Sequence, residues 1–298
     1  MILLRILETC VPAVAFLLML AVGLDVTREG LRDVAGRWGF VIGATVAQAL
    51  ILPGVALFLV RIAAPEPRIA EYLLLVAACP SGGMSNVYVY LARANTALSV
   101  ALTACSCLLA IATIPLITAV YGAILGRPPG FALPIPTLLV QLLVMAVIPV
   151  IVGASIRDRW PETERRHGRQ LRAVSAAGVV AIVAIGLVQS AGTLDAGLVI
   201  GGLLSIPFIL SGMASGWIVG LACRVPVPDR FTLLVEFSVR SLAIAMVIEV
   251  TLLHRPDFVG FGSVALLAQA SLLLMAVRWH LRSTVRAESR ATARSGRW

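Results

Sequence analysis

Two membrane-length apolar runs in this sequence are interrupted near their middles by residues that hydrocarbon does not tolerate. The first run, residues 71–93, carries the segment CPSGGMSN at its centre, and the second, residues 229–251, carries Glu236 and Arg240. Lipid offers no partner to a free backbone group or a charge, so such interruptions require surrounding protein or a water-filled cavity. A matched pair of broken spans in two halves of a chain is typical of a secondary transporter's binding site. We therefore predict a secondary transporter.

Composition places the whole chain in a membrane. Apolar residues make up 59% of it, and its mean hydropathy of +0.97 lies far outside the range of soluble proteins. Runs near the roughly 20 residues that a helix needs to cross a bilayer predict an all-α polytopic membrane protein of about nine transmembrane helices. The predicted spans are 6–24, 38–61, 71–92, 96–125, 134–156, 171–191, 196–222, 230–252 and 258–281.

The net charge of +9 is a topology signal rather than a sign of nucleic-acid binding. All basic residues are arginines, and most lie in alternate links, at 28–37, 93, 157–172, 224–230 and 278–297. By the positive-inside rule we expect an inner (plasma) membrane protein with its N-terminus outside and its C-terminus in the cytoplasm. In a rival interpretation residues 1–24 are a cleaved signal peptide, which would put the 28–37 link outside, against that rule.

Each of the two broken spans lies between two unbroken helices, so the same order of three spans occurs twice. Spans 2–4 and 7–9 run in opposite directions under the predicted topology, as inverted repeats require. We expect residues 282–298 to form a basic, disordered cytoplasmic tail that contacts anionic lipid.

The first break supplies oxygen ligands for a small hard cation. Pro80 removes a backbone donor, the following glycines permit unusual dihedrals, and Ser85 and Asn86 come next. Ser99 and Thr103 on the next span are four residues apart and share one helix face. Such oxygens suit sodium. The alternative for each hydroxyl is a hydrogen bond to its own helix.

Glu236 is the one acid expected deep inside a span, since Glu249 lies near a predicted span end. A carboxylate at that depth needs a cation or a proton. The candidates are a bound sodium ion and Arg240, which is one helical turn away at i+4. The alternative is a self-compensating ion pair with no part in transport. Gln48 is a second polar residue in an apolar span. It is either a hydrogen-bond partner for another helix or an ion ligand.

Other functional classes have less support. The five cysteines have no metal-ligand spacing, and we expect no organic cofactor. A serine protease built on Ser85 needs a histidine base in the membrane, whereas the three histidines fall in predicted links or the tail. A non-transporting sensor or scaffold stays open. We expect a monomer whose partners are the bilayer, a small organic anion and Na⁺ or H⁺.

Three segments resemble the bile acid:sodium symporter family. They are QALILP from Gln48, the CPSGGMSN segment continuing to Thr103, and EFSVRS from Glu236. The resemblance covers most of the chain. The chain is similar to a bacterial member of the family that lacks the first of the usual ten spans. It implies a panel domain of residues 1–37 and 126–192 and a core domain of 38–125 and 193–281, with two crossing broken helices.

The resemblance also implies two sodium sites that share one carboxylate. The first matches Ser85, Asn86, Ser99, Thr103 and Glu236. The second matches Gln48, Glu236, Phe237, Val239 and Arg240, where the family has glutamine at the last position. A guanidinium offers only donors and a fixed charge, so it cannot ligate sodium. We therefore expect Arg240 to stand in place of the second ion.

The substrate is expected beside the breaks, at Gly82, Gly83, Met84, Asn86, Arg240 and Ser241. Free amides at helix N-termini favour an anionic group, and so does Arg240. We expect a bile-acid-like or other carboxylate- or sulfonate-bearing solute, carried with sodium at one site, with protons or without coupling. Gly83 and Ser241 replace a threonine and an asparagine that are common in the family, so the exact solute stays open.

Overall fold

The structure is a computed structural model that describes residues 2–25, 27–125, 136–137, 140, 143–192, 201–255 and 257–295. Across these residues the chain is helical, without β-strands. The elements are α1 (Ile2–Asp25), α2 (Arg28–Ala35), α3 (Trp38–Ala63), α4 (Pro67–Ala78), α5 (Met84–Leu91), α6 (Thr96–Leu125), η1 (Leu143–Val147), α8 (Ile148–Arg159), α9 (Pro161–Gly192), α11 (Ser205–Ala222), α12 (Val227–Ser238), α13 (Leu242–Val247), η2 (Ile248–Leu252) and α14 (Phe258–Ser295), where η marks a π-helix.

Four helices in the described part of the chain are long and apolar enough to cross a membrane: Trp38–Ala63, Thr96–Ile124, Gly201–Ala222 and Phe258–Thr284. Large apolar side chains point away from the protein on α3, where Leu50 is 69% and Ile62 68% exposed. Such exposure suits lipid rather than water. The all-α membrane fold is thus confirmed, while the count of nine spans and the inverted repeats stay predictions.

Two pairs of short helices take the place of the two interrupted spans. The first pair, α4 and α5, is separated at residues 79–83, and the second, α12 and α13, at residues 239–241. Cys79 and Val239, the residues after α4 and α12, both have extended backbone, with ψ of 155° and 112°. Both predicted interruptions are therefore real breaks in the helices.

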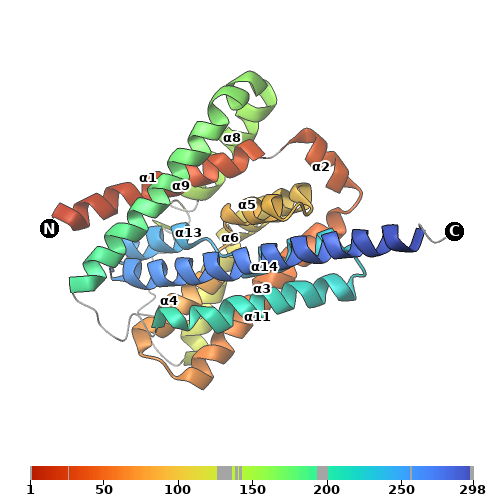
Figure 1. The fold of residues 1–298 in the computed structure, drawn as a ribbon. Helices are drawn as coiled ribbons and strands as arrows, with labels where there is room; N and C mark the ends of the chain where they lie inside the picture. The colour runs from red at the N-terminus through yellow and green to blue at the C-terminus, as the bar shows by residue number, and fades with distance from the viewer. Residues whose placement is uncertain are drawn as a thin grey trace.

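Three groups of helices lie side by side in Figure 1. Helices α1, α8 and α9 form one side, α13 and α14 lie in the middle, and α3, α4 and α11 form the other side. Small residues bring α1 and α8 into backbone contact, because a Cβ added at Gly23 would lie 2.2 Å from the Val150 carbonyl oxygen and one at Gly153 2.3 Å from that of Leu20. Close helix approach at small residues is typical of membrane proteins. The division into panel and core domains stays a prediction.

A glycine stripe on α11 holds α12 in place. Gly212, Gly216 and Gly220 recur every four residues and face α12. A Cβ added at Gly212 would lie 2.6 Å from the Phe237 carbonyl oxygen, and one at Gly216 2.3 Å from that of Leu233. Because these two carbonyls flank Glu236 along α12, the stripe fixes the position of that carboxylate.

Two of the basic segments differ from the sequence prediction. The basic link at 157–172 is mostly helical, since α8 ends at Arg159 and α9 begins at Pro161. The expected disordered tail instead continues α14 to Ser295, and residues 296–298 lie outside the described part. His280, which we counted with the links and the tail although it lies just before residue 282, is buried in α14 and stacks on Phe231 with ring centroids 4.2 Å apart. Packing of α14 on α12 accounts for the burial of His280.

We expect Gly216→Ala to lower the free energy of unfolding by about 1–3 kcal/mol, because the added methyl overpacks a contact with a backbone oxygen. The measurement is the thermal unfolding midpoint in detergent. Gly43→Ala is the matched control, since nothing lies within 4 Å of a Cβ placed there in α3. Equal midpoints for the two variants would contradict the role of the stripe.

Candidate functional site at the crossing of two helix breaks

The two breaks cross and satisfy one another's backbone groups. Residues Ser81 and Arg240 form an isolated antiparallel β-bridge, and the Ser241 amide donates to the Pro80 carbonyl oxygen at 2.9 Å. The Ser81 amide donates to Ser106 Oγ of α6 at 3.1 Å. Unpaired backbone groups are costly away from water, so these contacts allow two helices to be open at the same depth.

The Glu236 carboxylate is fully buried beside this crossing. Its Oε2 accepts a hydrogen bond from Ser81 Oγ at 2.6 Å, and its Oε1 accepts one from Ser99 Oγ at 2.5 Å. Thr103 Oγ1 lies 3.2 Å from both carboxylate oxygens. Ser99 and Thr103 thus share one face of α6, as the sequence predicts.

The oxygens around Glu236 outnumber the hydrogens that can join them. Ser99 Oγ lies 2.7 Å from Asn86 Oδ1 as well as 2.5 Å from Glu236 Oε1. Its single hydrogen can serve only one of these two acceptors. Thr103 Oγ1 faces the same choice and also lies 3.2 Å from Ser85 Oγ. Two changes would remove the conflict: a positive charge among these oxygens, or a reversed Asn86 amide, whose Nδ2 has no partner among the described residues in the present orientation.

The structure therefore brings together all five residues assigned to the first ion site. Ser85, Asn86, Ser99, Thr103 and Glu236 come from α5, α6 and α12 and are all buried. Sequence reasoning missed Ser81, which donates to the same carboxylate. The position of Ser81 inside the break could have indicated this role, because a hydroxyl is not needed there to turn the chain. That these residues bind an ion stays a prediction.

Of the two candidate partners for Glu236, the i+4 ion pair with Arg240 is not present. No ion pair joins them in the described structure, and the Arg240 Nη2 donates instead to the Cys79 carbonyl oxygen. Helix α12 ends at Ser238, and Val239 is extended, so the i+4 geometry of a continuous helix does not apply. Arg240 is 4% exposed, and its Nε and Nη1 have no hydrogen-bond partner among the described residues.

The residues assigned to a second ion site are less well connected. Gln48 on α3 is buried, and neither atom of its amide has a hydrogen-bond partner in the part described. No hydrogen bond therefore joins its side chain to Glu236 or Arg240. Phe237 and Val239 are both buried, the first in the last turn of α12 and the second in the break.

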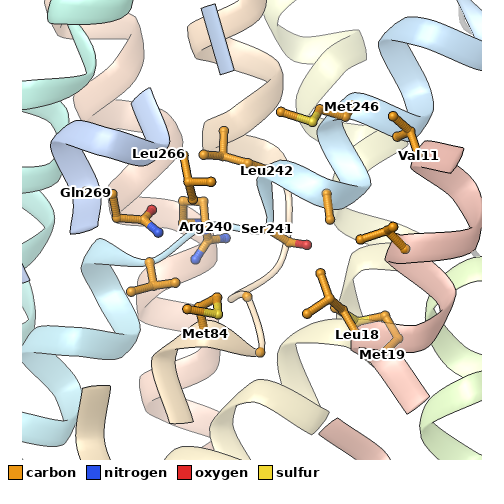
Figure 2. Close-up of a pocket in the computed structure, with 15 residues that line it drawn as sticks. Val11, Leu18, Met19, Met84, Arg240, Ser241, Leu242, Met246, Leu266 and Gln269 are labelled. Atoms are coloured by element: carbon orange, nitrogen blue, oxygen red, sulfur yellow. The ribbon is translucent and has the colours of Figure 1, made fainter. Parts of the chain in front are cut away.

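A cavity lies between the crossing and α1 (Figure 2). Arg240 and Ser241 lie between Leu18 and Met19 of α1 on one side and Leu266 and Gln269 of α14 on the other. Of the residues predicted to contact substrate, Gly82, Gly83, Met84, Arg240 and Ser241 line this cavity. Asn86 does not, because its side chain turns toward Ser99.

The cavity encloses about 50 Å³ in this conformation. That volume holds a few water molecules and is too small for an organic anion. Its lining is apolar apart from Arg240, Ser241, Gln269 and backbone groups. Any larger occupant requires α1 to move away from the crossing.

We expect Ser81→Ala to lower the free energy of unfolding by about 1–3 kcal/mol, because it removes a donor from a buried carboxylate oxygen. Ser263→Ala is the control, since Ser263 is equally buried but bonds only to the Val259 carbonyl oxygen of its own helix, at 2.7 Å. Thermal unfolding of both variants measures the difference. Equal losses of stability would show that the Glu236 contact is unimportant.

Comparison with known proteins supports a single family. The chain is 29% identical to a sodium-dependent transporter of Bacillus subtilis (strain 168) over 76% of this chain and 68% of that protein. It is 28% identical to a chloroplastic protein of Arabidopsis thaliana named as a probable sodium/metabolite cotransporter, over 77% and 56%. It is also 28% identical to the human ileal sodium/bile acid cotransporter, over 61% and 51%. The alignments thus span about half to two thirds of these relatives.

A family model described as the sodium bile acid symporter family matches residues 12–196, which include the second part of α1, all of α2 to α6 and the first break. Glu236 and Arg240 lie beyond this match. Since the match covers more than half of the sequence, the chain belongs to the sodium bile acid symporter family.

Proposed function

We propose that this protein is a secondary transporter of organic anions, which works by alternating access and is coupled to one sodium ion at Glu236. The observation that carries the proposal is the buried cluster of oxygens from Glu236, Asn86, Ser99 and Thr103, in which neighbouring oxygens lie 2.5 to 3.5 Å apart. Membership of a symporter family supports it.

The oxygens at this site fit a hard monovalent cation. Ser85, Asn86, Ser99, Thr103 and Glu236 supply hydroxyl, amide and carboxylate oxygens, which are the ligands of hard ions. Within the described residues, no three or more of the side chains His, Cys, Asp and Glu form a group that could hold a metal ion, so a softer transition metal has no support here. A bound sodium ion would supply the positive charge that Glu236 requires.

Arg240 takes the place of a second sodium ion in this proposal. Its charge is held at the crossing by the Cys79 carbonyl oxygen, and it cannot leave during the transport cycle. The ion stoichiometry is therefore one sodium ion rather than two. Gln48 is then released from ion binding.

The same arginine selects for an anionic solute. Its Nε and Nη1 have no partner among the described residues and lie beside an apolar cavity. A carboxylate or sulfonate accepts two such N–H groups in parallel, while the apolar body of the solute contacts α1 and α14. Because the cavity encloses only about 50 Å³, binding requires α1 to separate from the crossing, which is the motion expected for alternating access.

Uptake into proteoliposomes tests the function. Labelled taurocholate and simpler alkyl carboxylates and sulfonates are offered with an inward gradient of Na⁺, of K⁺ or of protons. We expect uptake of at least one anion that a sodium gradient drives and that saturates. Uptake driven only by a pH gradient would replace sodium with proton coupling, and no uptake of any anion would favour a sensor or scaffold.

Sodium binding has its own expected signature in stability. We expect Na⁺ in place of K⁺ to stabilise the purified protein by about 2.7 kcal/mol at one hundred times Kd, seen as a higher thermal midpoint. Thr103→Val should abolish the increase. Thr118→Val should keep it, because Thr118 is buried on the same helix but bonds to the Ile114 carbonyl oxygen at 2.8 Å. Loss in both variants would contradict the site.

We expect Arg240→Gln to restore a second ion site, because glutamine removes the fixed charge and adds a carbonyl oxygen to the residues assigned to that site. The Hill coefficient for sodium should rise from about one in the native protein to above one in the variant, measured from initial uptake rates. A coefficient well above one in the native protein would refute the substitution of ion by arginine.

A further inference from the structure

A second buried carboxyl, Glu249, is separate from the proposed sodium site. The sequence placed it near the end of a span, but its side chain is fully buried in the π-helix η2. Neither carboxyl oxygen has a hydrogen-bond partner among the described residues. Glu236, by contrast, accepts hydrogen bonds from Ser81, Ser99 and Thr103.

The charged groups near Glu249 are already paired with one another. Arg255 donates to Glu71 at 2.5 Å, while Asp257 accepts from Arg68 at 3.0 Å and from the Tyr72 hydroxyl at 2.8 Å. These groups come from α4 and from the segment that leads into α14. The Arg255 backbone amide also donates to the Glu249 carbonyl oxygen at 2.8 Å, so it is the backbone of Glu249 and not its carboxyl that is held.

The described side chains of the other elements packed on η2 contribute no compensating charge. Helices α1, α13 and α14 contact it. Along α14 the first charged residue is Arg278, several turns away, and α13 has none. Among the described side chains of α1, Asp25 is charged but lies at the opposite end, and Cys10 is an exposed thiol. Cys79, at the first break, is a neutral thiol on the side toward the crossing.

We propose that Glu249 is a proton-binding site, whose carboxyl is neutral in this conformation. An ionised carboxylate without a hydrogen-bond donor in the low-dielectric interior is costly by several kcal/mol, and a proton removes that cost. A metal cation would need several oxygen ligands, whereas the residues beside Glu249 in η2 and α13 are mostly apolar. The proton comes from solvent, forms one O–H bond and returns to solvent when the site opens.

The position of Glu249 links this proton to conformational change. A π-helix is frequent at functional sites, because its wider turn redirects side chains and loosens the helix. Since η2 contacts α1, the separation of α1 that the proposed function requires would let water reach Glu249 and release the proton. This second step rests on the proposed function, whereas the protonation itself does not.

Infrared spectroscopy of the purified protein in lipid tests the protonation without transport. We expect a carbonyl stretch from a neutral buried carboxyl at neutral pH, which disappears at alkaline pH. Glu249→Gln should remove this band, while Glu236→Gln and Glu71→Gln should keep it. If the native protein shows no such band, or if the band disappears only in Glu236→Gln, the proposal is wrong.

Thermal unfolding over pH gives a second readout that does not need the variant to be active. The folded state holds a proton that the unfolded state releases near neutral pH, so native stability should fall as pH rises. In Glu249→Gln the midpoint should change less with pH and exceed the native value at alkaline pH. A variant that unfolds more easily than the native protein at every pH would show an ionised, stabilising Glu249 and overturn the proposal.

Uptake separates the two steps. With labelled taurocholate or the anion that the first screen identifies, Glu249→Gln should weaken the pH dependence of the initial rate at constant sodium, and Glu71→Gln should preserve it. An infrared band at Glu249 together with unchanged pH dependence would keep the proton site and refute its link to transport. Absence of uptake in the native protein would refute the proposed function and leave the spectroscopic result intact.

Discussion

The exchange of hydrogen bonds between two open helices is the constraint on which this site depends. Neither break is tolerable alone in an apolar medium, because each exposes backbone groups that lipid cannot satisfy. Here the Ser241 amide donates to the Pro80 carbonyl oxygen, and Arg240 donates to the Cys79 carbonyl oxygen. Each break is therefore stabilised by the other, and the site belongs to the pair. Displacing either helix would weaken both the fold and the cluster of oxygens around Glu236.

The two breaks differ in how far the sequence could predict them. Pro80 and the two glycines after it mark the first break directly, since they remove a donor and permit unusual dihedrals. The second has no proline or glycine between Glu236 and Ser241, and only the charges there signalled it. Its exact position, after Ser238, was not predictable, and helical spacing applied across it gave a Glu236–Arg240 pair that the structure does not contain. Ser99 and Thr103 lie within one continuous helix, so the same rule succeeded there.

The sequence also did not predict which residues are buried by segments far away in the chain. Glu249 lies close to the end of its apolar run, yet it is fully buried because α1, α13 and α14 pack against the π-helix that carries it. His280 is buried by its stacking on Phe231. The glycine stripe of α11 could be read as a helix-packing motif, but not which helix it contacts. In each case the missing information is a contact between segments far apart in the chain.

A fixed guanidinium and an exchangeable sodium ion have different consequences for a carrier. In the proposed cycle, Glu236 and Arg240 contribute opposite charges that stay with the protein, and Glu249 is neutral while it holds its proton. The empty site then carries no net charge, and binding one sodium ion with one monovalent anion leaves it uncharged. With glutamine at position 240 the empty site would keep the charge of Glu236 and would need a cation to cross the membrane. Arg240 therefore lowers the electrostatic cost of the empty carrier's return, at the expense of the second sodium ion as a source of driving force.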